Sequence, residues 1–338
     1  MLIGLVGDIH FSQYSSILRK QGEKYSVRLE NCINSINWAE SLFNYYNCDS
    51  IVYLGDFFDK ESLNSVEITA LNDIIWSTNI YHEFLCGNHE MGKADLFYNS
   101  ANILNLIKNS EVITTPTKTI IDDCEICYLP YILEDDRKSL VDYFGTTNNK
   151  RVILSHNDIA GMQMGQFKSK QGFDINEIAS NCTYFINGHI HNEGKVADNI
   201  YNIGNLTGQN FSEDGFKYNH SVFILDTDTM KIQVFDNPYA VYFYKDDWTG
   251  GIPFDNTHKN FAVISVKVSE DTIDDAKQFI KDNPNIIESR VLLEPKLCTD
   301  IDKKEELSVD HLQKFSEFIF SKLDNTELLQ EEMEKICL

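Results

Sequence analysis

The chain has 338 residues, long enough for a large catalytic domain and a smaller second one, so its length predicts two domains. An apolar content of 42% is typical of a globular protein, and no apolar stretch reaches the roughly 20 residues that span a bilayer, which argues against a membrane protein. The net charge of −23 disfavours non-specific binding to nucleic acid, so a DNA substrate would need local compensation.

The eight cysteines show no paired framework of the kind found in secreted domains. A lone Cys-X-X-Cys run, Cys124 to Cys127, has no second pair or histidine at zinc-finger spacing and lies in a strand-like stretch. We therefore expect buried, reduced thiols and a cytoplasmic protein.

Strands and helices alternate along the first third of the chain. Apolar residues at helical spacing predict a helix over 26–46 and a helical stretch with apolar positions between 66 and 75. Short runs of apolar and aromatic residues predict strands at 2–6, 50–54 and 80–85. This alternation predicts an α/β sandwich with a largely parallel first sheet.

Shorter strands separated by turns follow from about residue 112. The expected strands are 118–121, 126–129, 152–154, 184–186 and 200–203, followed by a hairpin of 221–225 and 231–235. Such a run predicts a second sheet packed on the first.

The C-terminal part follows a linker, at 246–260, that contains Gly and Pro. A strand, a helix and a second strand are expected at 261–268, 271–281 and 286–293, which make a small α/β cap. Two amphipathic helices begin at Ser308 and Thr326. The expected domains are a catalytic domain, the cap and the C-terminal helices, at 1–245, 260–297 and 304–338.

Five short polar runs each follow an apolar, strand-like stretch. Open α/β sheets place their ligands at the carboxyl ends of the strands, so we expect the five runs to meet. They are Gly7-Asp8-Ile9-His10, Gly55-Asp56-Phe57-Phe58-Asp59, Gly87-Asn88-His89-Glu90, Ser155-His156-Asn157 and Gly188-His189-Ile190-His191. One such run arises easily by chance, whereas all five in order indicate one site.

Aspartate, asparagine and histidine are ligand types of a dinuclear metal site. Two residues apart in an extended chain, Asp8 and His10 project to the same side and can bind one ion. Asp56 is the candidate for a bridging ligand, because a carboxylate has two oxygens. The candidate ligands are Asp8, His10, Asp56, Asn88, His156, His189 and His191.

The mixture of imidazole and oxygen ligands favours a transition metal over an all-oxygen magnesium site. We expect two divalent ions, manganese first, with iron, zinc or magnesium as alternatives. Two such ions activate water and neutralise charge on a phosphate ester, which indicates phosphoester hydrolysis. His89, next to the ligand Asn88, is the candidate catalytic residue, either contacting the phosphate or protonating the leaving oxygen.

Two small basic clusters are candidates for DNA contact against the acidic background. The first comprises Arg19, Lys20 and Lys24, and the second comprises Lys168 and Lys170. Solvated loop lysines are the alternative explanation for both clusters.

The five polar runs resemble the signature of the calcineurin-like metallophosphoesterases. Within that superfamily the chain looks like the nuclease subunit of the SbcD type, including the recombination endonuclease subunits of large bacteriophages. The chain length, the lack of an Asp-Arg-Gly run, the segment Gly204-Asn205-Leu206-Thr207 and the expected C-terminal elements carry this narrower resemblance. It implies a four-layer α-β-β-α sandwich with a small α/β cap and C-terminal helices.

The resemblance also implies roles for single residues. One metal would lie on Asp8, His10, Asp56 and His191, and the other on Asp56, Asn88, His156 and His189, with His89 catalytic. Asp59 stands where many cellular relatives carry a second histidine, so its role is open.

Proteins of this type act with an SMC-like ABC ATPase in double-strand-break processing and recombination. The resemblance implies a 3′ to 5′ exonuclease on double-stranded DNA and a single-strand endonuclease, an ATPase bound by the C-terminal helices, and a homodimer formed by helices after Asp56 and His89. A basic surface on the partner would compensate for the acidic charge of this chain in DNA binding. The alternatives are a stand-alone nucleotide phosphodiesterase and a non-catalytic DNA-end tether that regulates the ATPase.

Overall fold

A computed structural model describes residues 1–13, 15, 18, 20–93, 95–164, 167–252 and 261–294. The expected helices at 304–338 and the candidate DNA contact Arg19 lie outside the described residues. Among the helices that are described, none combines the length and the apolar character needed to cross a membrane.

Six strands form the first sheet. They are β1 (Leu2–Val6), β2 (Ser50–Tyr53), β3 (Tyr81–Leu85), β6 (Ser110–Ile113), β15 (Ser221–Asp226) and β16 (Lys231–Asp236). Their order is β16-β15-β1-β2-β3-β6, with parallel pairs from β1 to β6 and antiparallel pairs at the β15 and β16 edge. The parallel half and the predicted hairpin of β15 and β16 are therefore confirmed.

A second sheet also has six strands. They are β7 (Thr117–Ile121), β8 (Cys124–Leu129), β9 (Lys150–Ser155), β12 (Tyr184–Asn187), β13 (Gly194–Ala197) and β14 (Ile200–Asn202). Their order is β13-β14-β12-β9-β8-β7, and the four inner strands are parallel. Cys124 and Cys127 are buried on β8, in two different cores, as expected for structural thiols.

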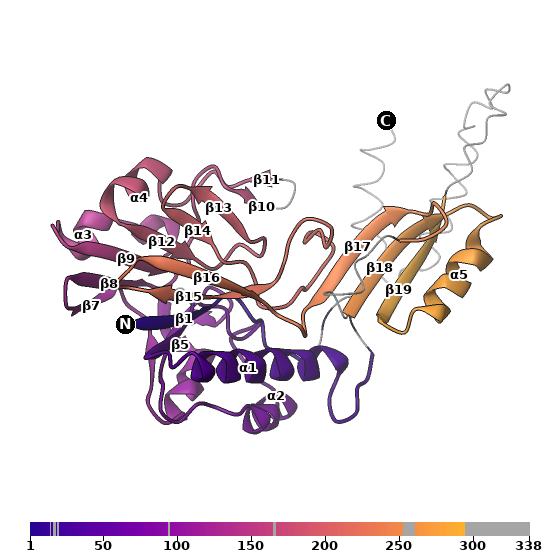
Figure 1. Ribbon diagram of the computed structural model, residues 1–338, viewed down its shortest axis with the longest axis horizontal. Helices are drawn as coiled ribbons and strands as arrows, with labels where there is room; N and C mark the ends of the chain where they lie inside the picture. The colour runs from indigo at the N-terminus through magenta and orange to yellow at the C-terminus, as the bar shows by residue number, and fades with distance from the viewer. Residues whose placement is uncertain are drawn as a thin grey trace, which may run out of the picture. The chain divides into compact units, whose positions relative to one another are not determined.

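The two sheets share one apolar core, and helices cover their outer faces. Ile3 and Val52 of the first sheet pack with Ile126 and Val152 of the second. The helices are α1 (Val27–Tyr45) and α2 (Ser65–Ala70) on the first sheet, and α3 (Leu140–Phe144) and α4 (Ile175–Asn181) on the second, as Figure 1 shows. The four-layer α-β-β-α sandwich expected from the sequence is confirmed.

A third, three-stranded parallel sheet follows the sandwich in sequence. It consists of β17 (Val241–Asp247), β18 (Phe261–Val268) and β19 (Ile286–Leu293), and helix α5 (Ile273–Asp282) packs with it. The strand β17 was not identified in the sequence. Its residues Val241 and Phe243 pack with Leu18, which comes from the loop after β1.

The remaining elements are short. They are two hairpins, β4 (Met91–Lys93) with β5 (Asp95–Asn99) and β10 (Gln163–Met164) with β11 (Phe167–Lys168), and the 3₁₀ turns η1 (Leu71–Asp73), η2 (Ser100–Leu106) and η3 (Glu134–Asp136). The helical stretch expected up to residue 75 is thus divided into α2 and η1. After His89 the chain forms the β4 and β5 hairpin before any helical turn.

Glu83 makes the stability of this fold depend on pH. It lies on β3 with 8% of its surface exposed, and burial raises the pKa of its carboxyl to about 6. The folded state therefore binds the proton more tightly than the unfolded chain, and stability falls as pH rises from about 4.5 to 6. At pH 7 the ionised carboxyl costs about 2 kcal/mol.

We expect Glu83→Gln to raise the free energy of unfolding at pH 7.5 by up to about 2 kcal/mol, and to lose this advantage near pH 4.5. Urea unfolding at both pH values measures the difference. The exposed Glu23→Gln serves as the control and should change stability by less than about 0.5 kcal/mol. An equal gain at both pH values would contradict the explanation from charge burial.

Candidate metal centre

The five polar runs lie at the carboxyl ends of five strands. Asp8 and His10 follow β1, Asp56 follows β2, and Asn88 and His89 follow β3. In the second sheet His156 follows β9, and His189 and His191 follow β12. Because parallel strands of a sheet end at the same edge, the sandwich brings these side chains to one side of the molecule.

Left-handed backbone turns aim three of these side chains. His10, Asp56 and His189 have φ angles of 49°, 46° and 70°, a conformation that costs roughly 1–3 kcal/mol unless the surroundings fix it. Gly55 has a φ of 89°, and a Cβ atom there would lie 2.3 Å from Nδ1 of His156. The glycine that precedes Asp56 is therefore required by the close approach of His156.

One cluster of ligand atoms comprises Asp8, His10 and His191. These atoms all lie within 4.8 Å of one another. Nε2 of His10 is 3.1 Å from Nε2 of His191, and Oδ2 of Asp8 is 3.9 Å from the first and 3.8 Å from the second. Two imidazole nitrogens and one carboxylate oxygen thus face one another.

A second cluster comprises Asp56, His156 and His189, again with ligand atoms within 4.8 Å. Oδ2 of Asp56 lies 3.2 Å from Nε2 of His156 and 3.8 Å from Nε2 of His10, which belongs to the first cluster. Oδ1 of Asn88 is 3.3 Å from Nε2 of His156. Asp56 is therefore placed between the clusters, where a bridging ligand is needed.

Hydrogen bonds to Nδ1 determine which nitrogen of two histidines is available. Nδ1 of His156 donates to the carbonyl of Leu54 at 2.6 Å, since a carbonyl oxygen only accepts. Nδ1 of His191 lies 2.7 Å from Oε1 of the buried Glu213. In both rings a proton on Nδ1 leaves the lone pair of Nε2 for a metal ion.

A third cluster comprises His10, Asp59 and His89, whose ligand atoms also lie within 4.8 Å of one another. Oδ1 of Asp59 is 3.1 Å from Nδ1 of His10, and the backbone carbonyl of Asp59 accepts a hydrogen bond from Nδ1 of His89 at 2.9 Å. The His89 side chain is 42% exposed, and its ring centroid is 4.5 Å from that of His10. His89 therefore sits at the open side of the site with Nε2 left for another partner.

The charges and donor atoms of the first two clusters fit divalent metal ions. Asp8 and Asp56 are almost fully buried, and Oδ2 of Asp8 has no hydrogen-bond partner among the described residues. Although burial lowers the pKa of His156, the charges of Asp56 and Asp8 raise it to about 10. The buried carboxylates therefore need a positive charge beside them, which two divalent ions on mixed nitrogen and oxygen ligands would provide.

A comparison with known families decides the assignment. The sequence profile described as calcineurin-like phosphoesterase matches residues 1–193. The chain belongs to this family. It is accordingly a metal-dependent hydrolase of phosphate esters, and its clustered carboxylate and imidazole groups fit two divalent ions.

Solved structures similar to this phosphoesterase share little sequence with it. A dimetal phosphatase from Danio rerio has 13% identity and a TM-score of 0.41, with 70% of this chain and 99% of that chain covered. YfcE, a phosphoesterase from E. coli, has 11% identity and a TM-score of 0.32, with 70% and 100% covered. A search of curated proteins found no match.

Two glutamates that the sequence analysis gave no role support this phosphoesterase site. Glu90 is fully buried, and its carboxylate accepts the backbone N–H groups of Gly87, Asp56 and Phe58 at 2.6, 3.2 and 2.9 Å. It thereby joins the loops after β2 and β3, and its place in the Gly-Asn-His-Glu run was the available signal. Glu213, the partner of His191, lies in no recognisable motif.

We expect Glu213→Ala to weaken metal binding by about 10–100-fold, because His191 loses the acceptor that fixes its ring and its protonated nitrogen. Isothermal titration calorimetry with manganese measures this change in affinity. Glu213→Gln keeps an acceptor oxygen and should lose less affinity. If both variants bind manganese as the unaltered protein does, Glu213 does not position His191.

The candidate DNA-binding lysines lie outside the metal clusters. Lys20, Lys168 and Lys170 are exposed. Nζ of Lys24 forms an ion pair with Asp73 at 2.6 Å, so its charge is offset within the protein. A DNA-contacting role for these lysines stays a prediction.

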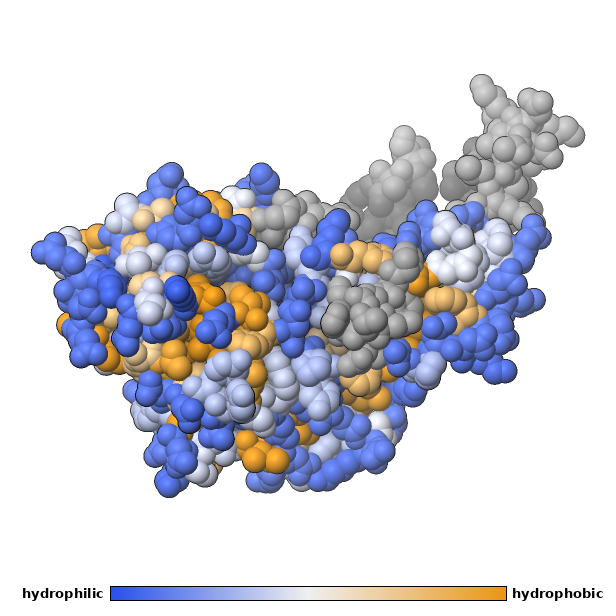
Figure 2. Space-filling view, in the orientation of Figure 1, coloured by the Kyte–Doolittle hydropathy of each residue, from blue (hydrophilic) through white to orange (hydrophobic). Residues whose placement is uncertain are grey.

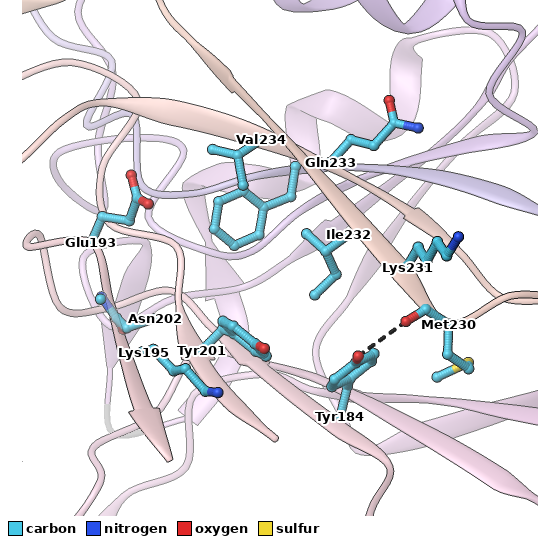
Figure 3. A pocket seen from close by; sticks show the side chains of 12 residues that line it. Tyr184, Glu193, Lys195, Tyr201, Asn202, Met230, Lys231, Ile232, Gln233 and Val234 are labelled. Atoms are coloured by element: carbon cyan, nitrogen blue, oxygen red, sulfur yellow. Dashed lines mark hydrogen bonds between the residues drawn. The ribbon is translucent and has the colours of Figure 1, made fainter. Parts of the chain in front are cut away.

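A separate apolar hollow lies between the edges of the two sheets. Figure 2 shows apolar side chains gathered over β15 and β16, and the hollow there has a volume of about 530 Å³. Figure 3 shows Tyr184, Tyr201 and Ile232 around it, and the hydroxyl of Tyr184 donates to the carbonyl of Met230 at 3.0 Å. None of the predicted metal ligands borders this hollow, so it lies apart from the chemistry.

Proposed function

We propose that this phosphoesterase is a DNA nuclease of the SbcD type, a 3′ to 5′ exonuclease on double-stranded DNA and an endonuclease on single strands. The observation that carries the proposal is the openness of the site. His89 is 42% exposed, and His10 lines a hollow of about 260 Å³. A second hollow of about 670 Å³ is lined by Tyr131, whose ring centroid is 5.8 Å from that of His189. A polymer can pass such a site, whereas small-ligand sites usually enclose most of the ligand.

Some residues of the site would bind metal, and one would transfer a proton. Two divalent ions on the clusters would supply Lewis-acid activation of water and neutralise charge on the phosphate. Asp56 connects the clusters, and the neutral oxygen of Asn88 completes the second one. His89 is oriented by the carbonyl of Asp59, so its Nε2 can carry a proton to the leaving oxygen. We propose manganese as the metal, because the ligands mix imidazole with oxygen.

Arg28 connects two segments of this site through hydrogen bonds to their backbone. Its side chain is buried, and the guanidinium donates to the carbonyls of Ile9, His10 and Gly208 at 3.0, 3.3 and 2.9 Å. These carbonyls belong to the loop after β1 and to the segment after His191. Five fixed donors suit this role, because a guanidinium can satisfy several carbonyls at once.

The proposed assembly includes a homodimer and an SMC-like ABC ATPase. Ile68, Ile75 and Leu106 are 45%, 74% and 84% exposed on α2, after η1 and on η2, and such an apolar surface supports a dimer contact. The ATPase contact is assigned to 304–338 on the resemblance alone. The same resemblance supports the division into a catalytic domain at 1–245 and a cap at 260–297.

The test offers the purified protein manganese with three substrates: single-stranded DNA, double-stranded DNA labelled at one end, and a small aromatic phosphodiester. Shortening of DNA from its 3′ end and internal cutting of single strands are expected. The variant Asp56→Asn, prepared in parallel, controls for contaminating nucleases. Turnover of the small diester without cleavage of DNA would overturn the proposal and favour the stand-alone nucleotide phosphodiesterase. DNA binding without turnover of any substrate would favour the non-catalytic tether.

A further inference from the structure

An aromatic groove of about 670 Å³ lies next to residues that contact the metal centre, although none of the predicted ligands lines it. Met91 lines the groove, and its backbone N–H donates to the carbonyl of the predicted ligand Asn88. Tyr131 also lines it, and its ring centroid is 5.8 Å from that of His189. Through these two residues the groove adjoins the metal centre.

The lining of this groove suits a flat apolar group better than a row of phosphates. Phe97, on the β4 and β5 hairpin, is 75% exposed, and Tyr131 and Pro116 add further flat surfaces. The charges of Arg137 and Lys138 are balanced by the carboxylates of Asp135 and Asp136, which also line it. Without a net positive charge, the groove has little to attract a phosphate backbone.

Arg137 lines the groove with a side chain that the protein holds in place. Only 9% of its side chain is exposed, it lies over the ring of Phe173 at 5.1 Å, and it pairs with Glu134. Its Nε is buried and has no hydrogen-bond partner in the part of the chain that is described. The guanidinium therefore stiffens the wall of the groove, and its buried Nε is closed to a ligand.

We propose that this groove binds a nucleobase of the DNA strand, next to the phosphate that is cleaved. The inference rests on the proposed nuclease function and specifies its substrate: a nucleotide unstacked from its neighbours. Phe97 and Tyr131 stack on the base. A volume of about 670 Å³ has room for a nucleoside, since sites for small ligands span roughly 300–1,000 Å³.

A double-mutant design tests this proposal with the full chain. One change is Phe97→Ala, and the other is an abasic residue in single-stranded DNA, placed in turn on each side of the scissile phosphate. Stacking on one aromatic ring predicts that each change alone raises KM about tenfold. Together they should raise KM no further than one alone, at one of the two positions, because both remove the same contact.

Binding gives a second readout that needs no turnover. A 2-aminopurine base at the sensitive position is expected to be quenched by the unaltered protein and to regain fluorescence with Phe97→Ala. Tyr45→Ala is the matched control, because Tyr45 is 78% exposed on α1 and does not line the groove. It should leave the quenching and the abasic effect as they are.

Three outcomes overturn the inference and are distinguishable. Additive effects of the two changes, with DNA cleavage intact, mean that Phe97 does not meet the base, and the nuclease function stands. A lower molar mass of Phe97→Ala in light scattering, again with an intact abasic effect, makes the groove a contact between copies. Failure of the unaltered protein to cleave DNA, with turnover of a small diester, removes the nuclease function itself and the inference with it.

Discussion

Asp56→Asn is expected to lower kcat for phosphodiester hydrolysis by about a thousandfold, the largest loss from any single change considered for this chain. Oδ2 of Asp56 lies 3.2 Å from His156 and 3.8 Å from His10, so one charged oxygen serves two clusters. An asparagine keeps the acceptor for the backbone N–H of His89 but removes the shared negative charge. Metal-assisted charge stabilisation is worth several kcal/mol, and about 4 kcal/mol corresponds to a thousandfold.

Metal content separates loss of the centre from loss of the fold in this variant. Elemental analysis after dialysis should find fewer than two ions per chain, while the circular dichroism spectrum stays unchanged. Asp198→Asn, at a fully exposed carboxylate outside the site, is the matched control and should keep both ions and full activity. Two bound ions and full turnover in Asp56→Asn would show that this carboxylate is not the shared ligand.

His89→Gln is expected to lower kcat on DNA by about a hundred- to a thousandfold while both metal ions stay bound. General acid catalysis contributes roughly 10²–10⁴-fold, and a glutamine cannot transfer the proton. The hydrogen bond from Nδ1 to the carbonyl of Asp59 orients the ring, and the exposed side of the site leaves Nε2 accessible to the substrate. Steady-state kinetics with DNA, together with elemental analysis, measure the two parts of this expectation.

The nature of the leaving group distinguishes the two roles open to His89. The alkoxide that leaves DNA needs a proton, whereas nitrophenolate leaves readily without one. General acid catalysis therefore predicts a large loss on DNA and a loss of no more than about tenfold on a nitrophenyl diester. Equal losses on both substrates would instead assign His89 to binding of the phosphate, and a fall in metal content would make it a ligand.

The course of α2 shows where sequence periodicity stops predicting local structure. Apolar residues up to Ile75 favour one continuous helix, but α2 ends at Ala70 and the chain becomes extended at Ile74. Side chains of α1 hydrogen-bond to the backbone there. Asn37 accepts the N–H of Ile75 at 2.7 Å, and Glu40 accepts that of Ser77 at 3.0 Å. The spacing of apolar residues along the sequence does not indicate such contacts with another helix.

The helix α1 and the hairpin of β15 and β16 were predictable because they depend on local sequence rather than on contacts with distant segments. A 19-residue helix with one apolar face, begun by Ser26, and a hairpin around an Asp-containing turn are each specified by their own residues. The third sheet was predicted in part. Its strand β17 was missed because it pairs with β18, which begins at Phe261, so its partner is not a neighbour in the sequence.

At the site, the types of ligand, their order and the strands that present them follow from the sequence, because each run is a local feature that follows a buried strand. The tertiary structure sets how the side chains group: His10 with His191, 181 residues apart, and Asp56 beside His156. It alone supplied the carbonyl of Leu54 and the carboxylate of Glu213 that fix two of the rings. Those partners come from separate elements, and only the packing of the two sheets brings them within hydrogen-bond distance.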